Sequence, residues 1–293
     1  MPDGPVLDSP ASADASTRPT AERLVRLKWR HRSFKLPVRV RYDGEILVVL
    51  LHGIGCSRES FDDAFASVSM HGYSMCAFDF PGHGAAAGLL SPRLLSKPRD
   101  FLQAYADVTC QVVRQVKDSG PKISQVFIVG HSMGGAVGVI AASDSDDING
   151  LVNIDGNLVA EDCGIVSRKM AEQSIREFLR TGFPELLADL RKSSGAEFKA
   201  WARWCAVANP RAVHQAAQSL VAWSDSGSLL EKFNEIPSRA YIYGSMDDRQ
   251  YIIKQINWAG IPIKAVPRSG HFAMIDNSSG FYSALSSALA GMR

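Results

Sequence analysis

One stretch decides the fold of this chain: Gln125-Val126-Phe127-Ile128-Val129-Gly130-His131-Ser132-Met133-Gly134-Gly135. An apolar run typical of a buried strand ends in Gly-x-Ser-x-Gly, and small residues typical of a helix follow. Such a turn needs glycine at Gly130 and Gly134, where a Cβ would clash, and it holds Ser132 at its tip in a strained conformation. The helix that begins at Met133 directs its free N–H groups toward that serine. The stretch therefore predicts a nucleophilic serine on a sharp strand-to-helix turn.

Composition limits what else the protein can be. Its 293 residues, 46% of them hydrophobic, fit one large α/β domain with a full core. The net charge of +2 gives no reason to expect a nucleic-acid partner. Five cysteines without a Cys-x-x-Cys pair argue against a disulfide framework or a zinc site. Neither a His-Glu-x-x-His motif nor a phosphate-binding loop occurs, so we expect no metal and no cofactor.

The N-terminal segment predicts no structure of its own. Residues 1–20 are rich in Pro, Ser, Ala and Asp and lack the apolar core of a secretory signal, so we expect a disordered tail. No apolar run approaches the length of a membrane span. We therefore expect a cytoplasmic protein, with its oligomeric state left open.

Strand patterns alternate with helical patterns along most of the chain, which predicts a mostly parallel sheet flanked by helices. From Arg23 to Arg41, charged and apolar residues alternate as in two strands with one solvated face. The later strands are predicted at 46–51, 73–78, 125–129, 148–154, 239–243 and 261–266, with a helix at about 100–116 and a closing helix at about 281–292. Polar residues follow several of these strands, at the edge where open α/β sheets bind their ligands.

Residues 158–235 break this alternation. They show no convincing strand and instead carry helix-period stretches at 170–179, 183–190, 197–207 and 210–223. We interpret the segment as a helical cap over the carboxyl edge of the sheet. The predicted organisation is a tail (1–20), a core in two parts (21–157 and 236–293) and the inserted cap (158–235).

A nucleophilic serine needs a base, and the base needs an acid that fixes its tautomer. His271 is the candidate base because it lies on a loop after the last strand, from which it can reach back over the sheet edge. Asp155 ends the strand after the nucleophile, and Asp247 lies three residues past Gly244. Both aspartates satisfy the order serine, acid, histidine, and the strand-Gly-x-x-Asp pattern favours Asp247.

The negative charge that develops during attack on a carbonyl needs hydrogen-bond donors. The backbone N–H of Met133 follows the nucleophile directly and is one candidate. The second is expected from the loop after the strand at 46–51, at the N–H of Ile54 in His52-Gly53-Ile54-Gly55.

Four motifs in this order make the chain resemble the α/β-hydrolase-fold superfamily across residues 24–292. They are His52-Gly53, Asp79-x-Pro81-Gly82-His83-Gly84, Gly130-His131-Ser132-Met133-Gly134-Gly135 and Gly270-His271. The resemblance implies a core of about eight strands, a Ser-His-acid triad, a lid and hydrolysis through an acyl-enzyme. A serine rather than an aspartate at the nucleophile position differs from the epoxide-hydrolase and haloalkane-dehalogenase branches.

These patterns together predict a serine hydrolase that cleaves an ester, thioester or lactone of a small-to-medium apolar substrate. The same triad also serves carbon–carbon bond hydrolysis, acyl transfer and perhydrolysis, which remain alternatives. A non-enzymatic ligand receptor on the same scaffold is a further alternative, since a fold alone does not fix function. The expected partner is a small molecule.

Overall fold

A computed structural model describes residues 19–29, 32–90, 100–258 and 260–292. Within them one sheet of eight strands has the order β1-β2-β4-β3-β5-β6-β7-β8. β2 pairs antiparallel with β1 and β4, and every later pair is parallel. The strands are β1 (Ala21–Trp29), β2 (Arg32–Arg41), β3 (Ile46–Leu51), β4 (Ser74–Phe78), β5 (Gln125–His131), β6 (Gly150–Ile154), β7 (Ser238–Gly244) and β8 (Ile263–Val266).

The central strands separate two hydrophobic cores, one on each face of the sheet. In β3, Leu47 and Val49 contribute to one core, whereas Val48 and Leu50 contribute to the other. Successive side chains of a strand point to opposite faces, so an unbroken apolar run can fill both cores only when helices cover both sides. The uninterrupted hydrophobicity of the central strands therefore reflects their position between two helical layers.

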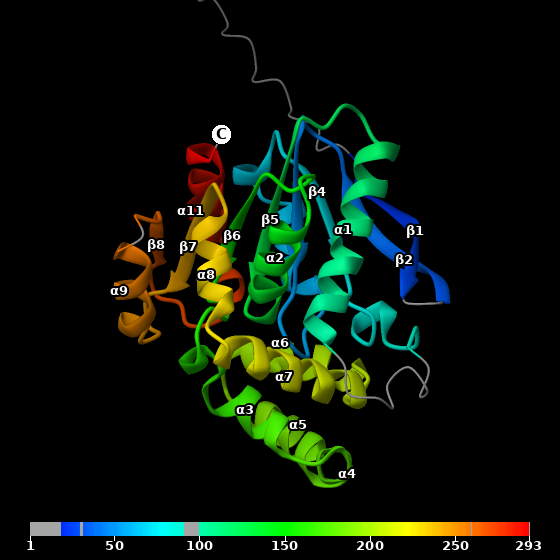
Figure 1. Cartoon of the computed structure of the whole chain (residues 1–293), viewed down its shortest axis with the longest axis vertical. Helices are drawn as coiled ribbons and strands as arrows, with labels where there is room; N and C mark the ends of the chain where they lie inside the picture. Colours follow the sequence, from blue (N-terminus) through cyan, green and yellow to red (C-terminus); the bar gives the residue numbers. More distant parts are fainter. Residues whose placement is uncertain (1–18, 30–31, 91–99, 259, 293) are drawn as a thin grey trace, which may run out of the picture.

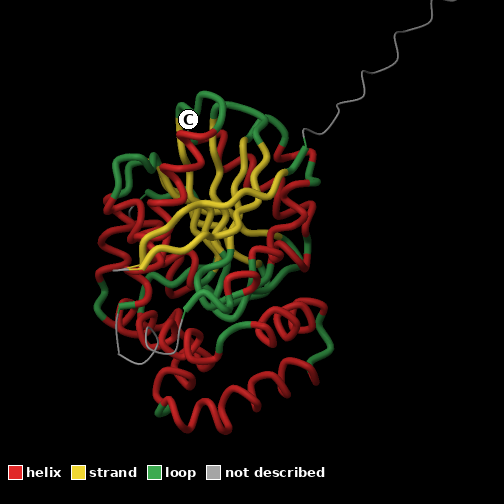
Figure 2. The backbone as a smooth tube through the Cα atoms, turned by 90° about the vertical axis from the view of Figure 1, so that its right-hand side faces the viewer, coloured by secondary structure: helices red, strands yellow, loops and turns green. Residues whose placement is uncertain are grey.

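Helices cover the sheet on both faces (Figure 2). On one face α1 (Phe101–Ser119) packs on α2 (Met133–Asp144), and α2 contacts β5 and β6. On the other face α11 (Ser278–Gly291) packs along β6, β7 and β8. The short helices are η1 (Arg58–Phe65), η2 (Val68–Met70), η3 (Gly84–Ala86) and α10 (Ala273–Asp276).

A second group of helices lies beyond one end of the sheet (Figure 1). It belongs to the connection between β6 and β7, which is described in full and contains helices only. Its elements are η4 (Ala160–Cys163), α3 (Gly164–Glu172), α4 (Ile175–Glu177), η5 (Phe178–Gly182), α5 (Phe183–Lys192), α6 (Ala196–Val207) and α7 (Pro210–Asp225). The last helix of the connection, α8 (Ser228–Glu235), returns alongside the sheet and packs on α2 (Figure 1). Among the described residues, no helix combines the length and apolarity that crossing a membrane requires.

The strands predicted from the sequence are all present, with carboxyl ends within two residues of those predicted, but some helices differ. The helix predicted at 170–179 is wrong: the chain bends at Gln173, whose carbonyl accepts a bond from the His214 ring. α8 and α9 (Gln250–Trp258) were not predicted. The tail predicted at 1–20 lies outside the described residues except for positions 19 and 20.

Candidate functional site

Ser132 occupies the turn between β5 and α2 in a conformation that L-residues rarely adopt. Its φ is 54° and its ψ is −122°. Its N–H donates to the Ile154 carbonyl of β6 at 2.9 Å, and its own carbonyl accepts the N–H of Gly135 at 2.9 Å. These bonds hold the strained residue in place, and such strain concentrates at functional sites.

Two glycines make this turn possible. A Cβ on Gly130 would collide with the backbone of Gly134, and a Cβ on Gly134 would collide with the carbonyl of Leu51 at the end of β3. α2 therefore begins in direct backbone contact with the neighbouring strands. The Gly-x-Ser-x-Gly spacing places these glycines where the close contacts occur.

The loop after β3 lies beside the serine. A Cβ built on Gly53 would be 3.2 Å from the Cβ of Ser132. The ring of His52 accepts the N–H of Phe80 through Nε2 at 3.0 Å, which braces this loop against the end of β4. The carbonyl of Ile54 accepts the indole N–H of Trp201 at 3.0 Å. The segment that carries Ile54 is thus fixed next to the nucleophile candidate from both the sheet and α6.

His271 lies on the loop between β8 and α10 and faces the same cavity as Ser132. His131, the residue before Ser132, contacts the backbone of His271: Nε2 of His131 lies 2.8 Å from the His271 carbonyl oxygen. Burial lowers the pKa of His131 to about 4, so this ring is neutral and donates through Nε2. His131 therefore positions the backbone of the candidate base.

Asp155 follows β6 directly and is fully engaged. Its side chain is buried, and one carboxylate oxygen accepts the N–H of Gly244 at 2.9 Å. The other accepts Nε of Arg249 at 3.0 Å. Its φ of 43° is another positive value for a residue other than glycine. Burial raises the pKa of Asp155 to about 7, although Arg249 and the Gly244 N–H oppose this shift.

Asp247 lies on the turn after β7, where its N–H donates to the Gly244 carbonyl at 3.0 Å. Its Oδ2 is 4.0 Å from Nδ1 of His271, about 1 Å longer than a hydrogen bond. Its side chain is 29% exposed, compared with 0% for Asp155. Burial raises its pKa, and the nearby Arg249 opposes that shift. Both candidate acids thus lie near His271, but they differ in exposure and in partners.

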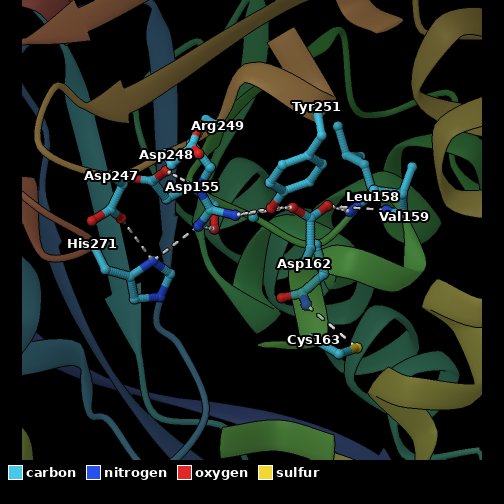
Figure 3. A network of polar contacts seen from close by, with 12 residues as sticks. Asp155, Leu158, Val159, Asp162, Cys163, Asp247, Asp248, Arg249, Tyr251 and His271 are labelled. Atoms are coloured by element: carbon cyan, nitrogen blue, oxygen red, sulfur yellow. Dashed lines mark hydrogen bonds and ion pairs between the residues drawn. The ribbon is translucent and has the colours of Figure 1, made fainter. Parts of the chain in front are cut away.

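The guanidinium of Arg249 contacts both Asp155 and the imidazole, whereas Asp247 faces the ring directly (Figure 3). Nη2 of Arg249 is 3.3 Å from Nδ1 of His271. A guanidinium can only donate, so in this arrangement Nδ1 accepts and the ring proton resides on Nε2. The His271 side chain is 36% exposed. Its pKa is nevertheless well below the ordinary value, chiefly through desolvation of the ring and then through His131 and Arg249.

A cavity of about 890 Å³ opens over these residues. Ser132 and His271 line it from the sheet edge, and Trp201 of α6 lines it from the helical segment. Its wall also includes three exposed apolar residues, with exposed fractions of 42% for Val166, 37% for Phe198 and 75% for Met246. The volume is within the range of small-molecule sites.

Asp155, Asp247 and His271 also offer atoms that could ligate a metal ion. Donor atoms of Asp155, Asp247 and His271 all lie within 4.8 Å of one another. The guanidinium of Arg249 already contacts two of the three, so a metal cation would face a positive charge at close range. The set fits a network of ion pairs better than a metal centre.

Sequence reasoning missed Arg249 and its partners Asp162 and Tyr251. Nη1 of Arg249 is 2.9 Å from Asp162 Oδ1 and 2.8 Å from the Tyr251 hydroxyl. The only signal was a basic residue in the turn that carries Asp247, two positions further on. Asp162 gave none, because it belongs to the helical segment and approaches the sheet edge only through the fold.

Comparisons with known proteins agree on the fold. The chain matches the alpha/beta hydrolase family over residues 48–284. Over 92 residues it is 33% identical to a Mycoplasma pneumoniae protein whose name assigns it to the esterases and lipases. That match covers 31% of this chain and 30% of the relative, so it spans less than a third of the relative's length.

Two solved structures extend the likeness to nearly the whole chain. One is a Burkholderia cenocepacia protein assigned as an aryl esterase, with a TM-score of 0.69, 18% identity and coverage of 93% of this chain and 99% of that one. The other is an N-acyl homoserine lactonase, with a TM-score of 0.66, 19% identity and coverage of 93% and 98%. At these identities the likeness concerns the fold.

The close backbone contact at the turn predicts the effect of a single methyl group. Gly134→Ala should destabilise the protein by about 3 kcal/mol, the upper range for forcing atoms into a packed interior, because its Cβ meets the Leu51 carbonyl. Urea unfolding measures this change. Gly88→Ala is the matched control, since a Cβ there meets nothing within 4 Å. Equal stability of the two variants would show that the turn has room to spare.

Proposed function

The chain belongs to the alpha/beta hydrolase family, and we propose that it is a serine hydrolase that cleaves esters, thioesters or lactones through an acyl-enzyme. The observation that carries this proposal is the strained Ser132 at a cavity that His271 also lines. A backbone held in this way presents its hydroxyl to a bound carbonyl. The relative and the two neighbours described above support ester and lactone chemistry.

In the proposed reaction, His271 reacts as the tautomer with its proton on Nδ1, and its free Nε2 takes the hydroxyl proton while Oγ of Ser132 attacks the substrate carbonyl. The resulting oxyanion is stabilised by the N–H groups of Met133 and Ile54. His271 then gives its proton to the leaving group, which departs and leaves an ester on Ser132. Water, deprotonated by His271, attacks this ester and releases the acid and the free serine.

We assign Asp247 as the acid that supports His271. The two carboxylate oxygens of Asp155 accept hydrogen bonds from the Gly244 N–H and from Nε of Arg249. In contrast, no hydrogen bond from another described residue reaches the carboxylate of Asp247. An unengaged, partly exposed carboxylate can close the 4.0 Å gap to Nδ1 by a side-chain rotation. Asp155 would have to give up a buried ion pair first.

The lining of the cavity supports an uncharged, largely apolar substrate. Carboxylates outnumber guanidinium groups on its wall, which disfavours anionic ligands. The acidic residues are Glu161, Asp162, Glu197, Asp247 and Asp276, and the arginines are Arg249 and Arg268. We propose that residues 158–235 act as the cap that contributes the apolar side of this site.

The first test concerns the nucleophile. A fluorophosphonate probe should label the protein, and Ser132→Ala should remove both labelling and hydrolysis of a p-nitrophenyl ester, because no other group replaces the activated hydroxyl. Ser143→Ala is the matched control, since this exposed serine of α2 bonds only its own helix at the Val139 carbonyl. Undiminished labelling of Ser132→Ala would place the nucleophile elsewhere.

The second test separates the two acids. Asp247→Asn should lower kcat by about 10⁴-fold, as expected when the base loses its orienting acid. Asp155→Asn should retain most activity per folded molecule but lower stability by about 3–5 kcal/mol, because Arg249 loses a buried partner. Steady-state kinetics and urea unfolding on both variants measure these changes. The opposite pattern in kcat would assign the acid to Asp155.

The third test is the pH dependence of kcat/KM, which reports groups of the free enzyme. The pKa of His271 lies well below its ordinary value of 6.5. A lower pKa keeps the imidazole neutral in more acidic solution, so activity should stay constant as the pH falls through 6.5 and decline only below it. Ester hydrolysis followed by pH-stat gives the profile. A midpoint at or above 6.5 would contradict this electrostatic description of the base.

A further inference from the structure

Arg249 takes no part in the chemistry proposed above, yet its buried side chain contacts four residues of the site. It reaches Asp155 after β6, Asp162 of η4, Tyr251 of α9 and His271 after β8. Figure 3 shows the guanidinium in the middle of these groups. Hydrogen bonds to four residues fix the position and orientation of the buried guanidinium.

The first consequence concerns Asp155. One carboxylate oxygen of Asp155 lies within 4.8 Å of an oxygen of Asp247 and a ring nitrogen of His271, so distance alone does not exclude Asp155 as a partner of the imidazole. The ion pair with Nε of Arg249 at 3.0 Å occupies the oxygen that the Gly244 N–H leaves free. Both oxygens of Asp155 thus already accept a hydrogen bond, and Arg249 contacts both Asp155 and Nδ1 of His271.

The second consequence concerns the imidazole. While Nη2 of Arg249 donates to Nδ1, the ring proton is on Nε2, and a ring in that tautomer cannot accept the serine proton there. Once Nδ1 carries the proton, the guanidinium repels it and a carboxylate attracts it. Asp247, 4.0 Å away, is the carboxylate that Arg249 does not hold by a hydrogen bond.

We propose that Arg249 is a positioning residue that decides which aspartate serves His271: it bonds to Asp155 and, before substrate binds, to Nδ1 of His271, so that Asp247 alone accepts the hydrogen bond from Nδ1–H once the ring proton is on Nδ1. This proposal rests on the proposed serine hydrolase function. It extends that function by explaining why two acids at adjacent strand ends do not compete.

Several titratable and charged groups surround the His271 ring. His131 on β5, Asp155 after β6, and Asp247 and Arg249 between β7 and α9 are its closest neighbours. The wall of the cavity adds Glu161 and Asp162 on η4, Glu197 on α6, Asp276 on α10 and Arg268 on the same loop as His271. A substitution that removes the positive charge of Arg249 also leaves the carboxylate of Asp155 without its ion-pair partner.

The experiment is a double-mutant cycle between Arg249→Gln and Asp247→Asn, read as kcat for p-nitrophenyl ester hydrolysis. In the native background Asp247→Asn should cost about 10⁴-fold. In the Arg249→Gln background the same change should cost about 10- to 100-fold less, because the released Asp155 substitutes. Adding Asp155→Asn to the double variant should restore the full loss. Equal costs in both backgrounds would overturn the proposal.

The pH profile separates positioning from a purely structural role. Arg249→Gln removes a cation next to His271 and leaves the negative charge of Asp155 without its partner, and both changes raise the pKa of the His271 ring. The acidic limb of kcat/KM should therefore move to higher pH, whereas Arg249→Lys, which keeps the charge, should leave it near its native position. An unmoved limb in Arg249→Gln would count against the proposal.

A measurement on the native protein covers the case in which Arg249→Gln fails to fold. Nitrogen-15 NMR of histidine-labelled protein, with His271 assigned by His271→Gln, reports which ring nitrogen carries the proton. The proposal requires the Nε2–H tautomer without substrate, and an Nδ1–H tautomer would refute it. Full activity of Ser132→Ala would instead refute the proposed function, while the NMR result would still decide the placement of Arg249.

Discussion

The site depends on one constraint of the backbone: α2 begins in contact with the ends of β3 and β5. This approach leaves no space for side chains at Gly130 and Gly134. It also forces Ser132 into a positive φ of 54°, which costs about 1–3 kcal/mol. The strain persists because the N–H of Ser132 bonds to β6 and because α2 is buried along most of its length. Any packing change that relaxed the turn would move the hydroxyl away from the cavity.

A second constraint is electrostatic and joins parts of the chain that are far apart in sequence. Arg249 belongs to the turn after β7, Asp155 to the end of β6 and Asp162 to the start of the helical segment. Each of these side chains is largely shielded from water, so none is stable as an ion without the others. The network therefore links the helical segment to the sheet edge at the point where the candidate base sits. Its value lies in geometry more than in stability, since buried ion pairs contribute little net free energy.

The sequence predicted the parts of this structure that follow from local pattern. Apolar runs identified the central strands, and the residues that follow those strands gathered at one edge as parallel topology requires. The Gly-x-Ser-x-Gly spacing located Ser132 because its glycines are needed for a local reason. The role of Arg249 could not be predicted, because three of its partners, Asp155, Asp162 and His271, lie 94, 87 and 22 residues away along the chain. The helix predicted across Gln173 failed for a similar reason: a carbonyl that bonds to His214, 41 residues away, competes with the helical bond.

The 4.0 Å distance between Oδ2 of Asp247 and Nδ1 of His271, too long for a hydrogen bond, has a chemical use in the proposed mechanism. A general base must be neutral before attack and stabilised after it has taken the proton. A carboxylate bonded tightly to the ring in the free protein would stabilise the protonated form too early and raise its pKa. In this structure Nη2 of Arg249 lies 3.3 Å from Nδ1 of His271, and Oδ2 of Asp247 lies 4.0 Å from the same nitrogen. The carboxylate gains most of its interaction only as the imidazolium forms, which is the differential stabilisation that lowers a barrier.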